Sequence, residues 1–375
     1  MSRPRIAIGG AVAQKPGAAG HAWQFLQYLL GFRRLGYDVL LLDRLTGPPQ
    51  RGVAWMERVL GEAGLADAWS VDLGGGVHAG VGRSAAIEFL TDADLLLNVM
   101  GFIEDEALLG VARRRVFVDT DPGFPQMWCA LGLADVMAGH DAHVTIAERI
   151  GAPDCTVPEC GLEWTTTPQP VVLDAWPAQP AGSGGRFTSV ASWRGAYGPV
   201  DYEGRAYGLR AHEMRRFADL PRLAGGTFEL ALDIHPSDAG DAQRLEAGGW
   251  RLLAPRAVAS TPADYRRFVQ SSDAELMVAK GMYVGTRGGW LSERSLCYLA
   301  SGRPVLAQDT RFSECHPTGA GLLAFSTLDE ALAGVEAIRA DPAGHSAAAR
   351  ELARERFGSD RVLSRLLDRL GAVAA

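Results

Sequence analysis

Apolar residues in the first half of the chain form short continuous runs, separated by longer stretches in which apolar positions recur at helical spacing. The runs are "RIAIGG" (5–10), "YDVLLLD" (37–43), "ADLLLNVMG" (93–101), "RRVFVDTD" (114–121) and "AHVTIAE" (142–148). Between the first two lies "HAWQFLQYLLGFRRLG" (21–36), whose apolar residues share one helical face. Continuous apolar strands that alternate with helices are typical of a parallel sheet covered by helices on both faces.

The pattern lapses between about Trp164 and Arg186, where Pro, Gly and Thr dominate, and then it restarts. New strands are predicted in "RFTSVASW" (186–193), "TFELALDI" (227–234), "GWRLLA" (249–254), "AELMVAK" (274–280) and "RPVLAQD" (303–309). The tail from about Thr327 is predicted to be helical. We therefore expect an α/β protein with two Rossmann-like, doubly wound domains (1–170 and 186–375), joined by a linker (171–185). The last helix is expected to cross back onto the first domain. Ligands of such sheets bind at the carboxyl ends of the strands, in a cleft between the domains.

Composition agrees with a two-domain globular protein, because 375 residues exceed one ordinary core. The formal net charge of -7 argues against partners that present phosphate backbones, such as nucleic acid or an anionic membrane. Five cysteines, odd in number and scattered, predict neither a disulfide framework nor a zinc site. No apolar stretch reaches the length of a membrane span, and a cytoplasmic location is expected. Lys15 and Lys280 are the only lysines. The oligomeric state is not indicated by the sequence.

Two segments resemble glycosyltransferases of the GT-B fold. One is "TRGGWLSERSLCYLASGRPVLAQD" (286–309), which is similar to the segment that holds the nucleotide sugar in this superfamily. The other is "GAAGHAWQFLQYLLGFRRLGYDV" (17–39), which looks like the first loop and helix of many members. The resemblance implies that the second domain holds a nucleotide-sugar donor and the first holds the acceptor. It also implies transfer of the sugar to a hydroxyl or amine, without a metal or another cofactor.

The donor segment suits an anionic ligand on physical grounds. Gly288 and Gly289 would let the backbone approach the ligand, and the free N–H groups of a helix start attract phosphate. Ser292 and Ser295 would donate hydrogen bonds, Arg294 would pair with phosphate, and Glu293 would accept from a sugar or ribose hydroxyl. In the alternative interpretation Ser292 only caps the helix, Glu293 favours its dipole, and Arg294 is solvated.

Further donor contacts are expected where other strands of the second domain end. Lys280 follows "AELMVA", and Ser192 and Arg194 follow the strand that begins at Arg186. The alternatives are a plain surface lysine and a flexible loop. Many members of the superfamily carry a glutamate seven residues before the proline of "G-x-P", but here that position is Cys297. Either Glu293, one turn earlier, replaces it, or donor recognition differs.

His21 is the expected catalytic base, because it begins the first helix at the predicted cleft. In inverting members of the superfamily a histidine at this place takes the acceptor proton. Such a base needs a carboxylate to orient it. Asp119 and Asp121, at the end of a predicted strand, are the candidates, with Asp119 favoured. The alternative is a histidine that only packs or caps at the helix end.

The aromatic residues Trp23, Phe124 and Trp128 are expected either to contact a flat acceptor, such as a small natural product, or to belong to the core. Other interpretations stay open. Asp119-Thr120-Asp121 spells the D-x-D of metal-dependent transferases, and Asp43 follows a strand where a dinucleotide-binding protein needs an acid. A nucleotide-sugar epimerase of the same fold and a non-catalytic sugar-nucleotide sensor are the functional alternatives.

Overall fold

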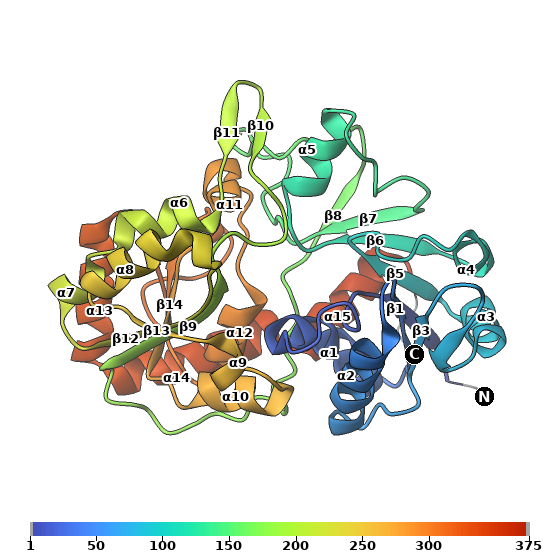
Figure 1. Ribbon diagram of the computed structural model, residues 1–375, viewed down its shortest axis with the longest axis horizontal. Helices are drawn as coiled ribbons and strands as arrows, with labels where there is room; N and C mark the ends of the chain where they lie inside the picture. The colour runs from blue at the N-terminus through green and yellow to red at the C-terminus, as the bar shows by residue number, and fades with distance from the viewer. Residues whose placement is uncertain (1–2, 373–375) are drawn as a thin grey trace.

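The computed structural model describes residues 3–372 and shows two α/β domains side by side (Figure 1). The first domain is built on an eight-stranded sheet of order β4-β3-β2-β1-β5-β6-β7-β8, in which every neighbouring pair except β3 and β4 is parallel. Its strands are β1 (Arg5–Gly9), β2 (Asp38–Arg44), β3 (Trp69–Asp72), β4 (His78–Gly80), β5 (Leu95–Val99), β6 (Arg115–Asp119), β7 (Ala142–Thr145) and β8 (Trp164–Thr166). Its helices are α1 (Ala19–Arg34), α2 (Pro49–Glu62), α3 (Arg83–Asp92), α4 (Glu106–Val111) and α5 (Phe124–Ala130).

The second domain has a six-stranded, fully parallel sheet of order β13-β12-β9-β14-β15-β16. The strands are β9 (Arg186–Ser192), β12 (Thr227–Asp233), β13 (Arg251–Leu253), β14 (Ala274–Met277), β15 (Val305–Gln308) and β16 (Leu322–Phe325). The helices are α6 (Arg210–Met214), α7 (Leu220–Ala224), α8 (Ala239–Ala247), α9 (Pro255–Val258), α10 (Pro262–Gln270), α11 (Gly281–Thr286), α12 (Glu293–Ala300), α13 (Leu328–Ala340), α14 (Pro342–Leu352) and α15 (Ser359–Arg369). Three short 3-10 helices are η1 (Arg215–Phe217), η2 (Pro236–Asp238) and η3 (Phe312–Glu314), and η4 (Ala353–Phe357) is a π-helix.

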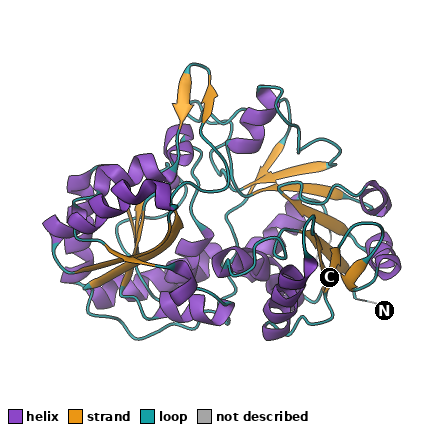
Figure 2. Ribbon diagram, viewed as in Figure 1, coloured by secondary structure: helices purple, strands orange, loops and turns teal. Residues whose placement is uncertain are grey.

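The predicted α/β class and the doubly wound sheets are confirmed. Each of the ten predicted apolar runs contains a strand, because helices cover both faces of the sheets and leave little room for polar residues (Figure 2). All five residues of β5 and all four of β14 are buried. The short strands β3, β4, β8 and β16 were not predicted, and they lie at or near the sheet edges.

Two chain segments cross between the domains, and they lie against each other. The linker residue Val171 donates its N–H to the Phe357 carbonyl at 2.8 Å, and Ser359 donates its N–H to the Val171 carbonyl at 2.9 Å. Beyond this crossing α15 packs on α1 of the first domain, where Gly31 leaves room for Leu363 and Ser359. The two domains are thus joined at a pair of hydrogen-bonded crossings.

A β-hairpin that was not predicted reaches from the second domain towards the first. Strands β10 (Val200–Tyr202) and β11 (Arg205–Tyr207) form it, and it stands beside α5 at the top of the molecule (Figure 1). Tyr207 donates its hydroxyl hydrogen to Thr156 Oγ1 at 2.9 Å, and the ring of Tyr197 lies 4.8 Å from that of Trp128. The hairpin therefore bridges the domains at one end of the cleft.

Candidate functional site

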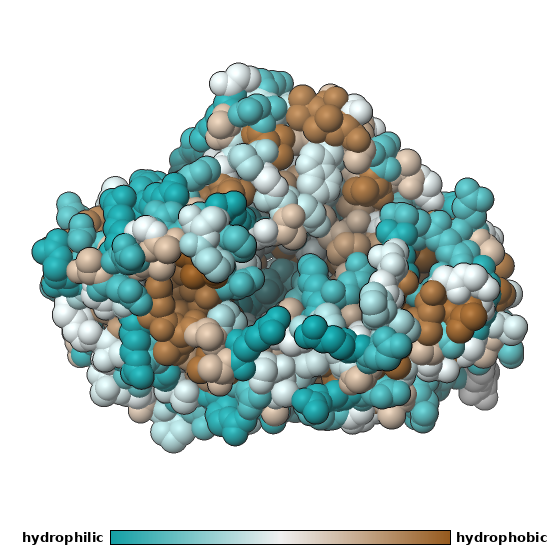
Figure 3. All heavy atoms as spheres, viewed as in Figure 1, coloured by the Kyte–Doolittle hydropathy of each residue, from teal (hydrophilic) through white to brown (hydrophobic). Residues whose placement is uncertain are grey.

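Each sheet has one point at which the strand order reverses, and the chain's two lysines lie at these two points. In the first sheet the reversal is at β1, which lies between β2 and β5, and Lys15 is in the loop that follows β1. In the second sheet β9 lies between β12 and β14, and Lys280 directly follows β14. The surface is hollowed between the domains (Figure 3). Ligands of doubly wound sheets bind at such reversal points, so this is the candidate site.

Lys280 crosses the cleft to reach a carboxylate of the first domain. Its Nζ donates to Asp121 Oδ1 at 2.8 Å and to the Tyr283 hydroxyl at 3.1 Å. Tyr283 in turn donates its hydroxyl hydrogen to the same carboxylate oxygen. The ring of Phe124 lies 5.2 Å from Nζ, within range of a cation–π contact. The side chain of Lys280 is 14% exposed, so the ammonium is held in a largely desolvated place.

Asp121 is flanked by both lysines. Burial alone would raise the pKa of its carboxyl group, but the charge of Lys280, the hydrogen bonds and the charge of Lys15 together lower it. The Lys15 side chain as a whole is exposed. Its ammonium group is nevertheless surrounded by enough protein that burial, followed by the charge of Lys280, lowers its pKa against the opposing charge of Asp121. Sequence analysis singled out Lys280 and Asp121 but gave Lys15 no role. The scarcity of lysine was the signal that pointed to it.

Asp119 does not have the predicted role of partner to His21. Its side chain is fully buried and accepts from Gln126 Nε2 and Thr145 Oγ1, both at 2.7 Å, and from the Asp121 N–H at 3.1 Å. Burial raises the pKa of Asp119 to about 7 in spite of these bonds. The carboxylate thus fixes the turn after β6 and the start of α5, and thereby the position of Asp121.

His21 lies where it was expected, in the first turn of α1, but without a carboxylate partner. Among the described residues its ring hydrogen-bonds only to the Ala11 carbonyl, at 3.2 Å from Nε2. A carbonyl only accepts, so Nε2 carries the hydrogen and Nδ1 has the free lone pair of the neutral ring. Burial, followed by the charge of Lys15, lowers the pKa of His21 to about 3. The geometry corrects the predicted His–Asp pair, because neither aspartate hydrogen-bonds to the imidazole, although the charge of Asp121 acts on it.

Gly288 and Gly289 do not line an open ligand site. A Cβ on Gly288 would lie 3.3 Å from Ala147 Cβ, and one on Gly289 would lie 3.1 Å from Arg149 Cγ. Ala147 and Arg149 belong to the first domain, and the Arg149 N–H donates to the Gly288 carbonyl at 3.0 Å. The two glycines therefore permit a close contact between domains, which corrects the predicted approach of the backbone to a ligand.

The polar residues at the start of α12 divide into a cap and two candidate contacts. Ser292 accepts from the Arg294 N–H at 3.3 Å and is the helix cap, as the alternative interpretation had it. Ser295 is fully buried, and its hydroxyl has no partner among the described residues. Glu293 is half-buried beside Ser292, and burial raises the pKa of its carboxyl group. Glu293 and Ser295 stay candidates for a ligand.

Arg294 is not free to pair with phosphate through two N–H groups. Its Nε donates to Glu275 Oε1 at 2.5 Å and its Nη1 donates to the Val190 carbonyl at 2.7 Å, and both charged side chains are at most 7% exposed. The fork of donors is thus largely used inside the second domain, which corrects the predicted bidentate role. Only Nη2 is without a partner among the described residues.

Arg210 is a buried cation that the sequence did not single out. It begins α6 and donates through Nη1 to the Val278 carbonyl, while its Nε has no partner among the described residues. Burial, followed by the charge of Arg294, lowers its pKa to about 10. No sequence signal could have found it, since its surroundings come from segments far along the chain, among them Val278 and Arg294. Unpaired buried N–H groups of two neighbouring arginines are places where a ligand or water is expected.

Ser192 and Arg194 are at the end of β9, as predicted, and both are exposed. Arg194 is engaged with Asp238 through two hydrogen bonds, of 2.8 and 2.6 Å. The next residue, Gly195, lies against Lys280: a Cβ there would be 3.4 Å from Lys280 Cε. The loop therefore borders the site, while the Arg194 guanidinium is bound to η2.

The three aromatic residues expected at the acceptor lie in the contact between the domains. Trp23 is 5% exposed, donates from Nε1 to the Pro262 carbonyl at 2.9 Å and packs on Trp176. Phe124 is 1% exposed and, with Trp128, packs on Tyr197. For Trp23 and Phe124 this corrects the acceptor interpretation in favour of the core.

Two other interpretations of the sequence find no support in the geometry. Asp43 is 3% exposed, and both its oxygens accept hydrogen bonds from residues 13, 14 and 44, so it cannot bind a dinucleotide ribose. The oxygens of Asp119 are likewise taken by protein donors. Across residues 3–372, no three His, Cys, Asp or Glu side chains gather so that they could hold a metal ion. In the same range no helix is long and apolar enough to cross a membrane.

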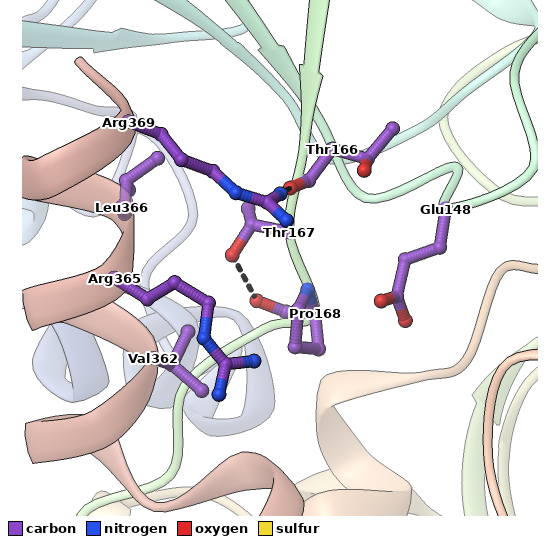
Figure 4. Close-up of a pocket in the computed structure, with 8 residues that line it drawn as sticks. All are labelled: Glu148, Thr166, Thr167, Pro168, Val362, Arg365, Leu366 and Arg369. Carbon is purple, nitrogen blue, oxygen red and sulfur yellow. Dashed lines mark hydrogen bonds between the residues drawn. The ribbon is translucent and has the colours of Figure 1, made fainter.

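A small cavity of about 70 Å³ lies away from the two lysines, between α15 and the end of β8 (Figure 4). Arg369 donates to the Thr166 carbonyl at 2.6 Å, Thr167 to the Pro168 carbonyl at 3.0 Å, and Glu148 pairs with His316 at 2.7 Å. Arg365 is the lining polar side chain left without a partner among the described residues, and it is exposed. One exposed arginine does not define a ligand site, so we assign the cavity no function.

Comparison of the sequence with known protein families and with characterised proteins finds no match. Solved structures with a similar fold are found. An alpha-glucosyltransferase in complex with UDP and DNA is 11% identical with a TM-score of 0.59. HepE from Anabaena, in complex with UDP and glucose, is 12% identical with a TM-score of 0.58, and sucrose-phosphate synthase from Thermosynechococcus elongatus is 11% identical with a TM-score of 0.54. Each alignment covers 99% of this chain and 100% of the other. The chain has the GT-B fold of these glycosyltransferases over its whole length, which confirms the predicted resemblance.

Proposed function

We propose that this protein is a glycosyltransferase that transfers a sugar from a nucleoside-diphosphate sugar to a hydroxyl or amine of a small acceptor, without a metal ion. One observation carries the proposal: Lys15 and Lys280, the only lysines of the chain, flank Asp121 from the two domains at the reversal points of the two sheets. A diphosphate needs positive charge in a place sheltered from water, and two ammonium groups supply it where metal-dependent enzymes use a cation.

The donor diphosphate is proposed to lie between the two lysines. Asp121 interacts with both ammonium groups, and their positive charges would attract an anion. The diphosphate would take over the contacts that Lys280 makes with Asp121. As the sugar leaves the phosphate, negative charge grows on the phosphate oxygen, and fixed ammonium groups stabilise that charge. UDP-glucose is the first donor to test, because HepE and the alpha-glucosyltransferase were solved with UDP or UDP-glucose.

The start of α12 is proposed to hold the remainder of the donor. The unpaired N–H groups of Arg210 and Arg294 are buried behind this helix start and offer charge-assisted hydrogen bonds. Glu293 is proposed to accept from a ribose or sugar hydroxyl, the role that Cys297 cannot perform. Cys297 is itself buried and accepts a hydrogen bond from Gln27 of the first domain at 3.6 Å.

His21 is proposed to bind a hydroxyl group and to have no role as a proton-accepting base. A pKa near 3 keeps the imidazole neutral at pH 7 but makes it a weak base, whereas an efficient general base has a pKa near the working pH. The free lone pair on Nδ1 suits a hydrogen bond from a substrate hydroxyl. The acceptor is proposed to be a small molecule and not a nucleic acid, because the net charge of -7 disfavours a phosphate backbone.

A thermal-shift experiment with UDP-glucose and other nucleotide sugars tests the proposal, since a ligand that binds only the folded state raises the melting temperature. We expect UDP-glucose to stabilise the wild type and Lys280→Ala to weaken binding by about 10- to 100-fold, the value of one charge-assisted contact. Arg58→Ala is the matched control, because it removes an exposed positive charge from the later part of α2, whereas the first turn of that helix lies against Ala13 of the Lys15 loop.

Turnover is then measured as release of nucleoside diphosphate in the presence of candidate acceptors. Binding together with acceptor-dependent release supports the transferase. Binding without release would leave a sensor, and conversion of the donor sugar would reveal an epimerase. If no nucleotide sugar raises the melting temperature, the proposal is refuted.

A further inference from the structure

The loop that carries Lys15 is fixed by one buried carboxylate of the neighbouring strand. Asp43, in β2, is 3% exposed. Its Oδ2 accepts from the Ala13 N–H at 2.6 Å, and its Oδ1 accepts from Gln14 Nε2 at 3.1 Å and from the Arg44 N–H at 2.6 Å. The Lys15 N–H then donates to the Val12 carbonyl at 3.2 Å. The two residues before Lys15 are therefore both held by this carboxylate.

Asp43 forms no ion pair with any described residue. The guanidinium of Arg44 pairs instead with Glu104, and Lys15 acts on Asp43 through its charge without a direct contact. A carboxylate buried without a cation is costly, and a protein keeps one only if its hydrogen bonds are worth the cost. An isosteric apolar residue would pack equally well against β1, but it could not hold the loop.

We propose that Asp43 is a positioning residue for donor binding: its carboxylate holds residues 13 and 14 so that Lys15 reaches the donor diphosphate. The proposal rests on the proposed function and adds to it a residue that touches no substrate. Asp43 is near the end of β2, one strand from the reversal point, and its hydrogen bonds to residues 13 and 14 connect it to the loop that carries Lys15.

Protonation of Asp43 should weaken donor binding, because a protonated carboxyl group loses acceptor capacity for the loop donors. Burial raises the pKa of Asp43 to about 7, so this loss falls in an accessible pH range. The charge of Lys15, in the loop after β1, acts on Asp43. The hydrogen bonds to the Asp43 carboxylate come from Val12, Ala13, Gln14 and Arg44. Asp119 is a second carboxylate whose pKa burial raises to about 7, and it accepts a hydrogen bond from the Asp121 N–H.

The test is the affinity for UDP-glucose at pH 6 and pH 8, measured by calorimetry on the wild type, Asp43→Asn, Lys15→Ala and the double variant. The diphosphate diester of this probe has no group that titrates in the range. We expect wild-type binding to weaken by about 10-fold from pH 8 to pH 6. Asp43→Asn should bind weakly at both values. Asp119→Asn removes the second titration. Because Asp119 also positions Asp121, only the pH dependence of this variant is compared, and its affinity should still fall from pH 8 to pH 6 by the wild-type factor.

The double variant separates positioning from general destabilisation. If Asp43 acts through Lys15, adding Asp43→Asn to Lys15→Ala should change the affinity by less than 2-fold, although each single variant loses about 10-fold. Additive losses, or an Asp43→Asn variant that binds like the wild type, would overturn the positioning role while leaving the transferase proposal standing. If the wild type does not bind UDP-glucose at either pH, both proposals fail.

Discussion

Two glycine-rich segments of this protein look alike in sequence and have opposite roles in the structure. Both the loop 10–20 and the segment 287–295 contain several glycines and lead into a helix, α1 and α12 respectively. Gly17 of the first has φ +84° and no atom within 4 Å of the place of a Cβ. Gly289 of the second has φ +79°, but its Cβ position is enclosed by Arg149 and Cys315. The first segment is open around Gly17, although its Gly20 lies against Tyr265 of the second domain, whereas the second segment is enclosed at Gly289.

The difference shows what a glycine-rich turn before a helix does and does not imply. Its backbone can approach another group closely, but that group is a ligand in one place and the neighbouring domain in another. At 10–20 the exposed Lys15 is left to meet a ligand. At 287–295 the buried cation Arg294 already forms an ion pair with Glu275. Only the contents of the space beside the glycines separate the two cases.

The largest expected effect is on the stability of the joining segment. Arg294→Met leaves Glu275 fully buried without its cation, and we expect the free energy of unfolding to fall by about 3–5 kcal/mol. Urea denaturation measures this change. The double variant Glu275→Leu/Arg294→Met should recover most of the loss, because no buried charge is left unpaired. A single variant that is as stable as the wild type but no longer binds UDP-glucose would make 287–295 a ligand segment after all.

An intermediate effect should distinguish the two glycines directly. Gly289→Ala must adopt a left-handed backbone and also displace Arg149 and Cys315, whose atoms lie 3.1 and 3.2 Å from the new Cβ. We expect a loss of about 2–3 kcal/mol in the free energy of unfolding. Gly17→Ala pays only the backbone strain, about 1 kcal/mol. Equal losses in urea denaturation would contradict the contrast between the open and the enclosed segment.

The smallest expected effect concerns His21, the first polar side chain after the open loop. Its pKa in the folded protein, about 3, lies below the 6.5 of an unperturbed histidine, so between these values the unfolded chain binds the additional proton. The free energy of unfolding should therefore fall as the pH drops below 6.5. We expect about 1 kcal/mol between pH 6.5 and pH 5, a value reduced for the partial exposure of the ring.

His21→Asn should lack this contribution, and urea denaturation of both proteins at the two pH values measures the difference. An identical pH dependence of wild type and variant would mean that the ring is well solvated. In that case His21 would be free to act as the base that the sequence suggested.

Much of the fold was predictable because it depends on local patterns. The apolar runs that became β1, β2, β5 and β14 are buried on both faces, so every residue of the run reports the strand. The hairpin β10–β11 was missed, since strands of three residues give too short a pattern. In the candidate site, Lys280 and Asp121 were singled out from their places at strand ends, Asp121 as a partner for His21 that it does not contact by a hydrogen bond, whereas Arg210 was not singled out. Its burial depends on segments far away along the chain.

By itself, the sequence determined the two doubly wound sheets, the strand ends at which ligands of such sheets bind and several of the polar residues at those ends. The hydrophobic periodicity and the alternation of strands with helices along the chain are properties of nearby residues, and they are enough to predict a doubly wound sheet. Only the tertiary structure decided the partners. It paired Lys280 with Asp121 across the cleft, enclosed Arg294 with Glu275, placed Gly288 and Gly289 against the other domain and left His21 without a carboxylate. Partners are decided by distance in space, and the charge and pKa of a side chain follow from its partners and its burial.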